Sequence, residues 1–193
     1  MEIKAAVAAH LRSALGPDSG RASVTFLGAE TVDVLRFGPA EDGTVRYATL
    51  GMSDAPMVDP SALVADPIRG PRAELLLSVR GKHDGAARAL AVLASAPRVE
   101  GLVVVAGASI DLGEPLWPGA RFTAVLVGEP GGLVPDLPGV EAGADLVSFF
   151  PLLPMTATEA AWKRVHGATA LEQRWLEHAV DLRDADRAAV SLA

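Results

Sequence analysis

The stretch from Thr44 to Val79 constrains the fold of this chain most, because it places two strand-like segments around one sharp turn. The first segment, Thr44 to Leu50, is dominated by β-branched, aromatic and small apolar residues. It stops at Gly51, which can adopt backbone angles closed to other residues, and Ser53 and Asp54 can hydrogen-bond their own backbone. The sequence therefore predicts two strands joined through a structured turn.

The second segment, Pro71 to Arg80, alternates in polarity as a half-buried strand does. One face is apolar and consists of Ala73, Leu75, Leu77 and Val79. The other face is mainly polar and carries Arg72, Glu74, Ser78 and Arg80. Leu76 is an exception on the polar face. We expect a strand with one face in the core and one face carrying charge, on which Glu74 pairs with Arg72 or Arg46 across the sheet.

The first third of the chain favours a helix followed by strands. Apolar residues repeat at helical spacing over residues 1–16, and Gly16-Pro17 ends this pattern. Strands are predicted over residues 22–27 and 31–37, and Asp42-Gly43 is a hairpin signal before the Thr44 strand. Short polar connections between sequential strands indicate an antiparallel meander. Residues 58–70 show no clear period and are expected to form a loop.

The second half mixes helices and strands. A helix is predicted over residues 86–96, where a proline follows, and a central strand over residues 120–127, which are apolar on both faces. A last strand is predicted over residues 145–153, and Pro151 and Pro154 would place it at a sheet edge. Ambiguous or irregular structure is expected over residues 99–105, 110–118 and 128–143.

Helices are predicted for the C-terminal residues 156–182. Thr156-x-x-Glu159 and Thr169-x-x-Glu172 both fit a capping box, and Gly167 between them can stop the first helix. The predicted fold class is therefore α+β, with a mixed, mainly antiparallel sheet flanked by helices. We expect a single domain over residues 1–193, whose sheet-rich body covers residues 20–154.

Composition narrows the function classes. The formal net charge of −7 argues against a nucleic-acid surface and suits either a basic protein partner or ordinary solubility. The absence of cysteine excludes disulfides, zinc–thiolate sites and thiol nucleophiles. The N-terminus has no signal-peptide pattern, and the longest apolar run, residues 102–110, is too short to span a bilayer. We expect a cytoplasmic protein that binds no membrane.

No catalytic constellation stands out. The four histidines are scattered and none has a second ligand at metal spacing, so we expect no metal, no cofactor and no enzymatic activity. A carboxylate cluster for acid–base chemistry is conceivable, but capping and ion pairing explain its members more simply: Asp54, Asp59, Asp66 and Glu74. Trp117, between Leu116 and Pro118 in an irregular loop, is a candidate exposed anchor for a partner.

Three short motifs carry a family resemblance. They are Thr49-Leu50-Gly51-Met52-Ser53-Asp54, Pro56-Met57 and Arg72-Ala73-Glu74-Leu75, and together they resemble the signature of the suppressor of fused (SUFU) family. Weaker similarity continues through Phe150–Met155 to Glu159, so the resemblance covers roughly residues 20–187. It implies a SUFU-like fold with one shared feature, structural or partner-binding, formed by Thr49, Gly51, Ser53, Asp54, Arg72 and Glu74.

The resemblance also implies a function. SUFU proteins are not known as enzymes but bind and hold other proteins, and compact bacterial members look like immunity proteins of polymorphic toxin systems. The expected role is therefore to bind and occlude a cognate toxin, with a basic toxin domain as partner. One alternative is a small-ligand-binding or hydrolytic domain with a polar pocket lined by Asp54, Arg72 and Glu74. Another is a homo-oligomer formed through residues 99–110 or an edge strand, so that monomer and homodimer both stay open.

Overall fold

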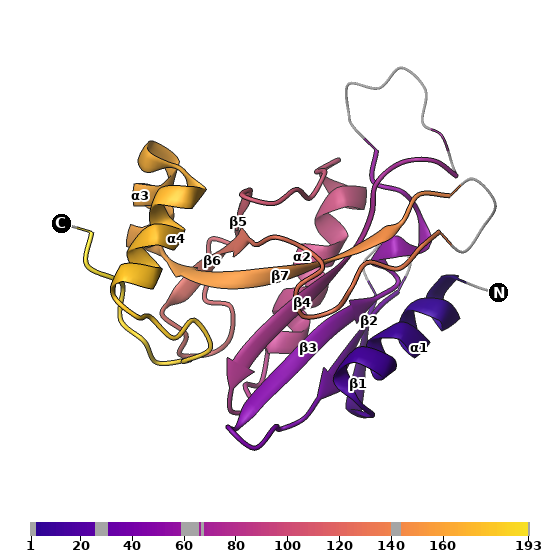
Figure 1. The fold of residues 1–193 in the computed structure, drawn as a ribbon, viewed down its shortest axis with the longest axis horizontal. Coiled ribbons are helices and arrows are strands. Elements are labelled where there is room, and N and C mark those ends of the chain that lie inside the picture. Colours follow the sequence, from indigo (N-terminus) through magenta and orange to yellow (C-terminus); the bar gives the residue numbers. More distant parts are fainter. Residues whose placement is uncertain (1–2, 26–30, 59–65, 67, 140–143, 193) are drawn as a thin grey trace.

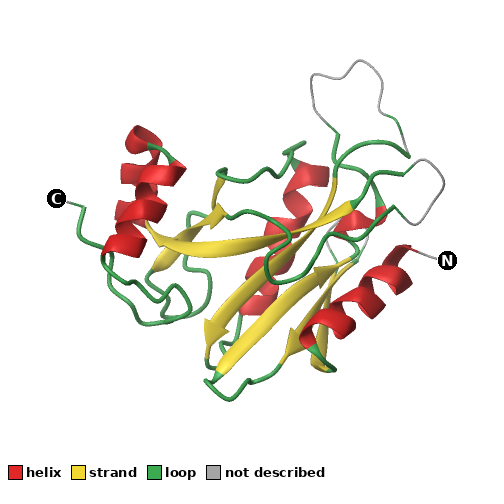
Figure 2. Ribbon diagram, viewed as in Figure 1, coloured by secondary structure: helices red, strands yellow, loops and turns green. Residues whose placement is uncertain are grey.

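The computed structural model describes residues 3–25, 31–58, 66, 68–139 and 144–192 (Figure 1). Within these residues, seven strands form one sheet in the order β1-β2-β3-β4-β7-β6-β5, and four α-helices pack around it (Figure 2). The elements are α1 (Ile3–Leu15), β1 (Asp18–Val24), β2 (Val32–Phe37), β3 (Thr44–Leu50), the 3-10 helix η1 (Met52–Asp54), β4 (Arg72–Arg80), α2 (Ala86–Val99), β5 (Ser109–Asp111), β6 (Phe122–Val127), β7 (Val147–Thr156), α3 (Ala157–His166) and α4 (Ala168–Glu177).

The sheet consists of two antiparallel parts joined by one parallel pair. Strands β1 to β4 form an antiparallel meander, and β5, β6 and β7 form a second antiparallel group. Strand β4 pairs in parallel with β7, with Arg72 opposite Val147 and Leu77 opposite Leu152. The predicted α+β class, with a mixed and mainly antiparallel sheet, is confirmed.

Both faces of the sheet are covered, which corrects the expectation that β4 carries charge on a solvent face. Helix α2 covers one face and packs on the predicted apolar residues of β4. Helix α1 covers the other face, where Val7 and Leu11 pack with Leu35, Leu76 and Phe149. Leu76 is therefore no exception, because it belongs to a second core. Both Arg72 and Glu74 are buried.

A third cluster of apolar residues lies at the β5–β6 end of the sheet, where α3 and α4 stand beside β6 and β7 (Figure 1). Leu171 and Trp175 of α4 pack there against Leu126 and Met155. The predicted capping box at Thr156 and Glu159 is present. The second predicted box, at Thr169, is absent, because Gly167 ends α3 and also serves as the N-cap of α4, which already begins at Ala168.

Strand β7 lies inside the sheet, so the prediction of an edge strand was wrong. Its two prolines fit because each faces a place where the pairing of β7 with the neighbouring strand has stopped. The carbonyl oxygen of Pro151 points toward the β6 side and accepts from the Gly128 N–H (2.8 Å), just past the end of β6. Pro154 faces the β4 side beyond the last β4–β7 pair, where Arg187 donates to its carbonyl oxygen (2.6 Å). Neither proline removes a ladder hydrogen bond.

Several element boundaries differ from the expected ones. Strand β1 begins four residues before the predicted start, at Asp18, and residues 26–30 lie outside the described part. Helix α2 continues past its proline to Val99, where the Glu100 N–H bonds the Ala96 carbonyl (2.8 Å), so residues 99–105 form no strand. The short β5 overlaps the first residues of the segment 110–118, which was expected to be irregular. Most of the predicted loop over residues 58–70 lies outside the described residues.

Across the residues that the structure describes, no helix combines the length and apolar character that a membrane crossing requires.

Candidate functional site

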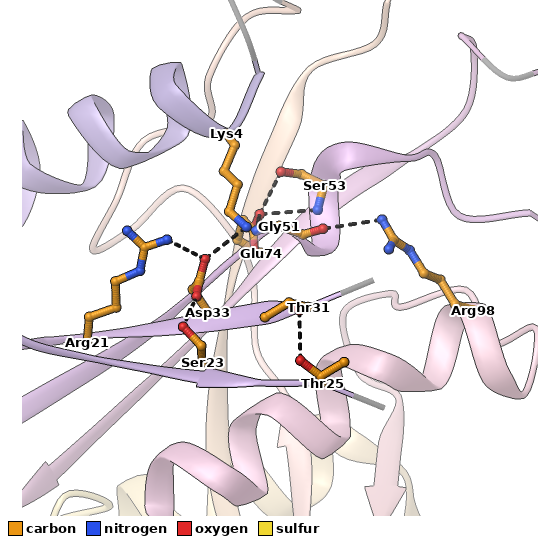
Figure 3. Close-up of polar contacts among 10 residues, drawn as sticks. All are labelled: Lys4, Arg21, Ser23, Thr25, Thr31, Asp33, Gly51, Ser53, Glu74 and Arg98. Atoms are coloured by element: carbon orange, nitrogen blue, oxygen red, sulfur yellow. Dashed lines mark hydrogen bonds and ion pairs between the residues drawn. The ribbon is translucent and has the colours of Figure 1, made fainter. Parts of the chain in front are cut away.

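The turn after β3 is organised around the side chain of Glu74, which extends from β4 and has no exposed surface (Figure 3). Its Oε1 accepts hydrogen bonds from the Gly51 N–H (2.9 Å), the Ser53 N–H (3.1 Å) and the Ser53 hydroxyl (2.6 Å). Its Oε2 accepts from the Thr49 hydroxyl (2.6 Å). Four donors thus converge on one buried carboxyl group and fix the turn to the neighbouring strand.

Two arginines hold the same turn from outside. Arg72 donates to the carbonyl oxygens of Ser53 (2.7 Å) and Ile68 (3.2 Å), and Arg98 of α2 donates to that of Gly51 (3.3 Å). Gly51 has a φ of 116°, a left-handed conformation in which a side chain would be strained. Glycine is therefore required at this position for its backbone conformation and not for a side-chain contact.

The expected pairing of Glu74 with Arg72 or Arg46 was wrong. The β3–β4 register places Arg46 opposite Ser78, four residues along the strand from Glu74. Arg72 is only 4% exposed, and its guanidinium bonds backbone carbonyls instead. Burial raises the pKa of the Glu74 carboxyl above its ordinary value, although the hydrogen bonds from Ser53, Thr49 and Gly51 offset part of this shift.

Arg72 lines a pocket of about 440 Å³, together with Met57, Asp145, Ser148 and neighbouring apolar residues. Neither Asp54 nor Glu74 lines it. The polar pocket expected from Asp54, Arg72 and Glu74 together is therefore not present at this place, because the Glu74 carboxylate faces inward and both of its oxygens are occupied.

Trp117 is buried, which corrects the expectation of an exposed anchor. The residue is 4% exposed, and its ring lies against His83 (centroids 4.9 Å apart) and Phe122 (5.9 Å) in the main core. The loop around it curls so that the Leu116 N–H bonds the Phe122 carbonyl oxygen (2.9 Å), which turns the indole inward. It does not join the Glu74 turn.

The remaining predicted carboxylates do not form a cluster either. Asp66 accepts hydrogen bonds from the Ile68 and Arg69 amides in an exposed loop, and Asp59 lies outside the described residues. No group of three or more histidine, aspartate or glutamate side chains in the described part of the chain could hold a metal ion.

A second polar centre, missed by the sequence analysis, surrounds Asp33 on β2 (Figure 3). Lys4 of α1 (2.8 Å) and Arg21 of β1 (2.6 Å) form ion pairs with its carboxylate, and Ser23 donates a further hydrogen bond. The signal in the sequence was an acidic residue flanked by two valines near the start of a mainly apolar strand. Burial opposes ionisation of Asp33, but the donors outweigh it and lower the pKa to about 2.

Replacing Asp33 with asparagine is expected to cost about 2 kcal/mol of unfolding free energy at neutral pH, which corresponds to lowering a carboxyl pKa from 3.8 to about 2. Because the folded-state pKa is lowered, this stabilisation is present above pH 3.8 and is lost as the pH falls toward 2. Urea denaturation of both proteins between pH 2 and 7 measures the difference. Asp111→Asn, which removes an exposed partner of Arg164, is the control and should differ little from the parent.

A third centre, also missed, ties the C-terminal segment to the body. Glu159 of α3 is completely buried and forms an ion pair with Arg187 (2.7 Å), whose second terminal nitrogen donates to the other carboxylate oxygen (3.0 Å). The Trp175 indole N–H (3.0 Å) and the Val190 N–H (3.0 Å) donate to the same carboxylate. Burial acts against ionisation of Glu159, but these donors, Arg187 first among them, hold its pKa below the usual value.

Comparison with known proteins identifies the family. The sequence profile of the suppressor of fused protein (SUFU) family matches residues 28–188. The chain belongs to the SUFU family. The profile covers all three polar centres except Lys4, Arg21, Ser23 and Val190. No curated protein matches the sequence.

Solved structures share the SUFU fold. A SUFU homolog from Neisseria gonorrhoeae superposes with a TM-score of 0.72 at 20% identity, over 98% of this chain and 97% of that one. A Sufu–Fu complex matches with a TM-score of 0.66 at 12% identity, covering 96% and 91%. Drosophila Suppressor of Fused matches with a TM-score of 0.66 at 11% identity, and the match covers 95% of this chain and 50% of that one. One of these solved structures is a complex of Sufu with Fu, so a protein with this fold binds another protein there.

Proposed function

We propose that this SUFU domain is a cytoplasmic immunity protein, which binds a cognate polymorphic toxin and occludes it without chemistry of its own. The observation that carries the proposal is family membership over residues 28–188, in a family of protein-binding domains. A structure with the same fold is a Sufu–Fu complex, which supports a partner that is a protein. The net charge of −7 supports a basic toxin domain, because opposite charge accelerates association.

The signature residues act, in this proposal, as the frame of the turn rather than as contacts to the toxin. Thr49, Ser53 and Glu74 have no exposed surface, and both carboxylate oxygens are bonded within the chain. Gly51 supplies a backbone conformation, and Arg72 supports the turn through backbone carbonyls. A partner protein would therefore contact other parts of the surface, and the turn would serve to keep the fold that presents them.

The test is capture of the tagged full chain from its native cell lysate, followed by co-expression with the proteins recovered. We expect stoichiometric recovery of one protein with a basic toxin domain, rescue of cells that express this domain, and loss of its activity in the purified complex. The association rate should fall steeply as salt rises, because exposed charges are screened. Glu74→Gln, which keeps one carbonyl oxygen toward the turn, is the matched variant and should bind as the parent does.

Two results would contradict the proposal. One is recovery of the chain alone, together with failure to rescue cells from any toxin encoded beside it. The other is a Glu74→Gln variant that melts like the parent but binds the toxin much more weakly, which would make the signature turn a contact surface. Size-exclusion chromatography of the same sample decides between a monomer and a homodimer.

A further inference from the structure

A pocket of about 280 Å³ lies between the first three strands and the connection from β4 to α2. Strands β1 to β3 contribute Gly20, Arg36 and Tyr47, among others, and the connection contributes Lys82 and His83. The first turn of α2 closes one side through Gly85 and Ala87. All of these residues belong to the described part of the chain and lie away from the Glu74 turn.

Tyr47 contributes a buried hydroxyl group to the lining of this pocket. The residue is 4% exposed, and its ring is part of the main core. Its hydroxyl oxygen is buried and has no hydrogen-bond partner of good geometry among the described residues. The backbone of His83 lies near enough to lower the pKa of the hydroxyl group, but a backbone amide only donates, so the hydroxyl proton still lacks an acceptor. A buried hydroxyl without a partner costs about 1–3 kcal/mol, so a phenylalanine would be favoured here unless the hydroxyl has a ligand to bind.

The charges around the pocket are mainly positive, although the whole chain is acidic. Arg21, Arg36 and Lys82 line it, against Asp84 as the one carboxylate of the lining. Asp33 pairs with Arg21 and compensates its charge (Figure 3). Arg36, by contrast, bonds the neutral hydroxyl and carbonyl oxygens of Ser19 (3.3 and 3.0 Å).

The backbone is arranged to admit the Arg36 guanidinium. A Cβ atom on Gly20 would lie 3.0 Å from one terminal nitrogen of Arg36 and 3.2 Å from its central carbon. Glycine at this position therefore leaves the space in which the guanidinium lies over β1. Helix α2 adds to the positive potential, because its N-cap Gly85 supplies no side-chain hydrogen bond and the amides of a first helical turn point outward.

We propose that this pocket binds an anionic oxygen group, a phosphate or a carboxylate, to which the Tyr47 hydroxyl donates and for which Arg36 and Lys82 supply the charge. Three independent features meet at one place: a buried hydroxyl donor without an acceptor among the described residues, two cations without a carboxylate partner in the same residues, and a helix N-terminus without a side-chain cap. The pocket does not depend on the proposed toxin binding, since the ligand can be a free anion or an acidic group of another molecule.

The test is a titration of the full-length ¹⁵N-labelled protein with inorganic phosphate and, separately, with acetate, followed by NMR at constant ionic strength. We expect saturable shifts of the amides from Lys82 to Ala87 and of Tyr47. Tyr47→Phe removes only the hydroxyl group and should weaken the binding about 5- to 10-fold, as expected for a lost hydrogen bond to a charged group. Lys82→Gln should weaken it as well, whereas Arg121→Gln, at an exposed position outside the pocket, should not.

The two titrations also identify the ligand. Saturation by phosphate alone assigns a phosphate site, and saturation by acetate alone assigns a carboxylate site. Shifts that rise linearly with concentration, or that are the same in the parent and in Tyr47→Phe, would mean that the pocket holds only solvent and would overturn the proposal. Because Lys82 is exposed, its variant remains a test even if Tyr47→Phe is less stable.

Discussion

Replacing Arg187 with methionine is expected to lower the free energy of unfolding by about 3–5 kcal/mol, the usual cost of leaving one member of a buried ion pair without its partner. Glu159 would stay completely buried with a negative charge and without its only cationic partner among the described residues. The Pro154 carbonyl oxygen would lose its donor at the same time. Urea denaturation at pH 7 measures the change.

A matched control and a pH series make this prediction specific. Arg164→Met removes an exposed ion pair with Asp111 and should cost at most about 1 kcal/mol. The parent Glu159 has a lowered pKa, so its stabilising contribution is present above the ordinary glutamate pKa and is lost as the pH falls below it. In Arg187→Met the buried carboxyl prefers to be protonated, so the difference from the parent should narrow in acid. If Arg187→Met and Arg164→Met lowered the free energy of unfolding equally, the buried ion pair would contribute no more to stability than the exposed one.

Replacing Glu74 with alanine is expected to cost about 4 kcal/mol or more, because four buried donors lose their acceptor at about 1–3 kcal/mol each. These donors are the amides of Gly51 and Ser53 and the hydroxyls of Thr49 and Ser53. Glu74→Gln keeps an oxygen for the donors that converge on Oε1 and should lose only about 1–2 kcal/mol. Thermal and urea unfolding of the three proteins gives the order parent, glutamine, alanine.

The glutamine variant also tests the ionisation of Glu74. Burial raises the folded-state pKa of this carboxyl, so the parent gains stability when it is protonated and loses it as the pH rises from about 4.5 through the folded pKa. Glutamine does not titrate, and the advantage of the parent over Glu74→Gln should therefore shrink as the pH rises. An advantage that grows with pH would mean that the four hydrogen bonds outweigh burial and that the pKa is lowered instead.

Local patterns predicted most of the secondary structure and the fold class. The alternation over Pro71–Arg80 located β4, the Thr156–Glu159 motif located the start of α3, and Asp42-Gly43 marked the β2–β3 hairpin. Each of these signals depends on neighbours in sequence. The α+β class followed because the strands of the first half and the C-terminal helices were both recognised.

Pairings between distant residues could not be predicted in the same way. Pro151 and Pro154 indicated an edge strand, and these prolines are compatible with the interior only because the pairing of β7 with β6 and with β4 stops where they lie. Arg187 lies in a segment without any period, and its carboxylate partner is 28 residues away. The sequence offered Arg72 or Arg46 as partners of Glu74, but its carboxyl group bonds Ser53 instead, because the β3–β4 register places Arg46 opposite Ser78.

The single parallel junction between β4 and β7 has a consequence for the order of folding. Each antiparallel part of the sheet can form from contacts between strands that follow one another closely in sequence. Pairing Arg72 with Val147, by contrast, closes a long loop. The chain loses conformational entropy in this closure before the contacts between β4 and β7 can stabilise it. This topology therefore favours a folding route in which the two antiparallel parts form first and the β4–β7 pairing forms last.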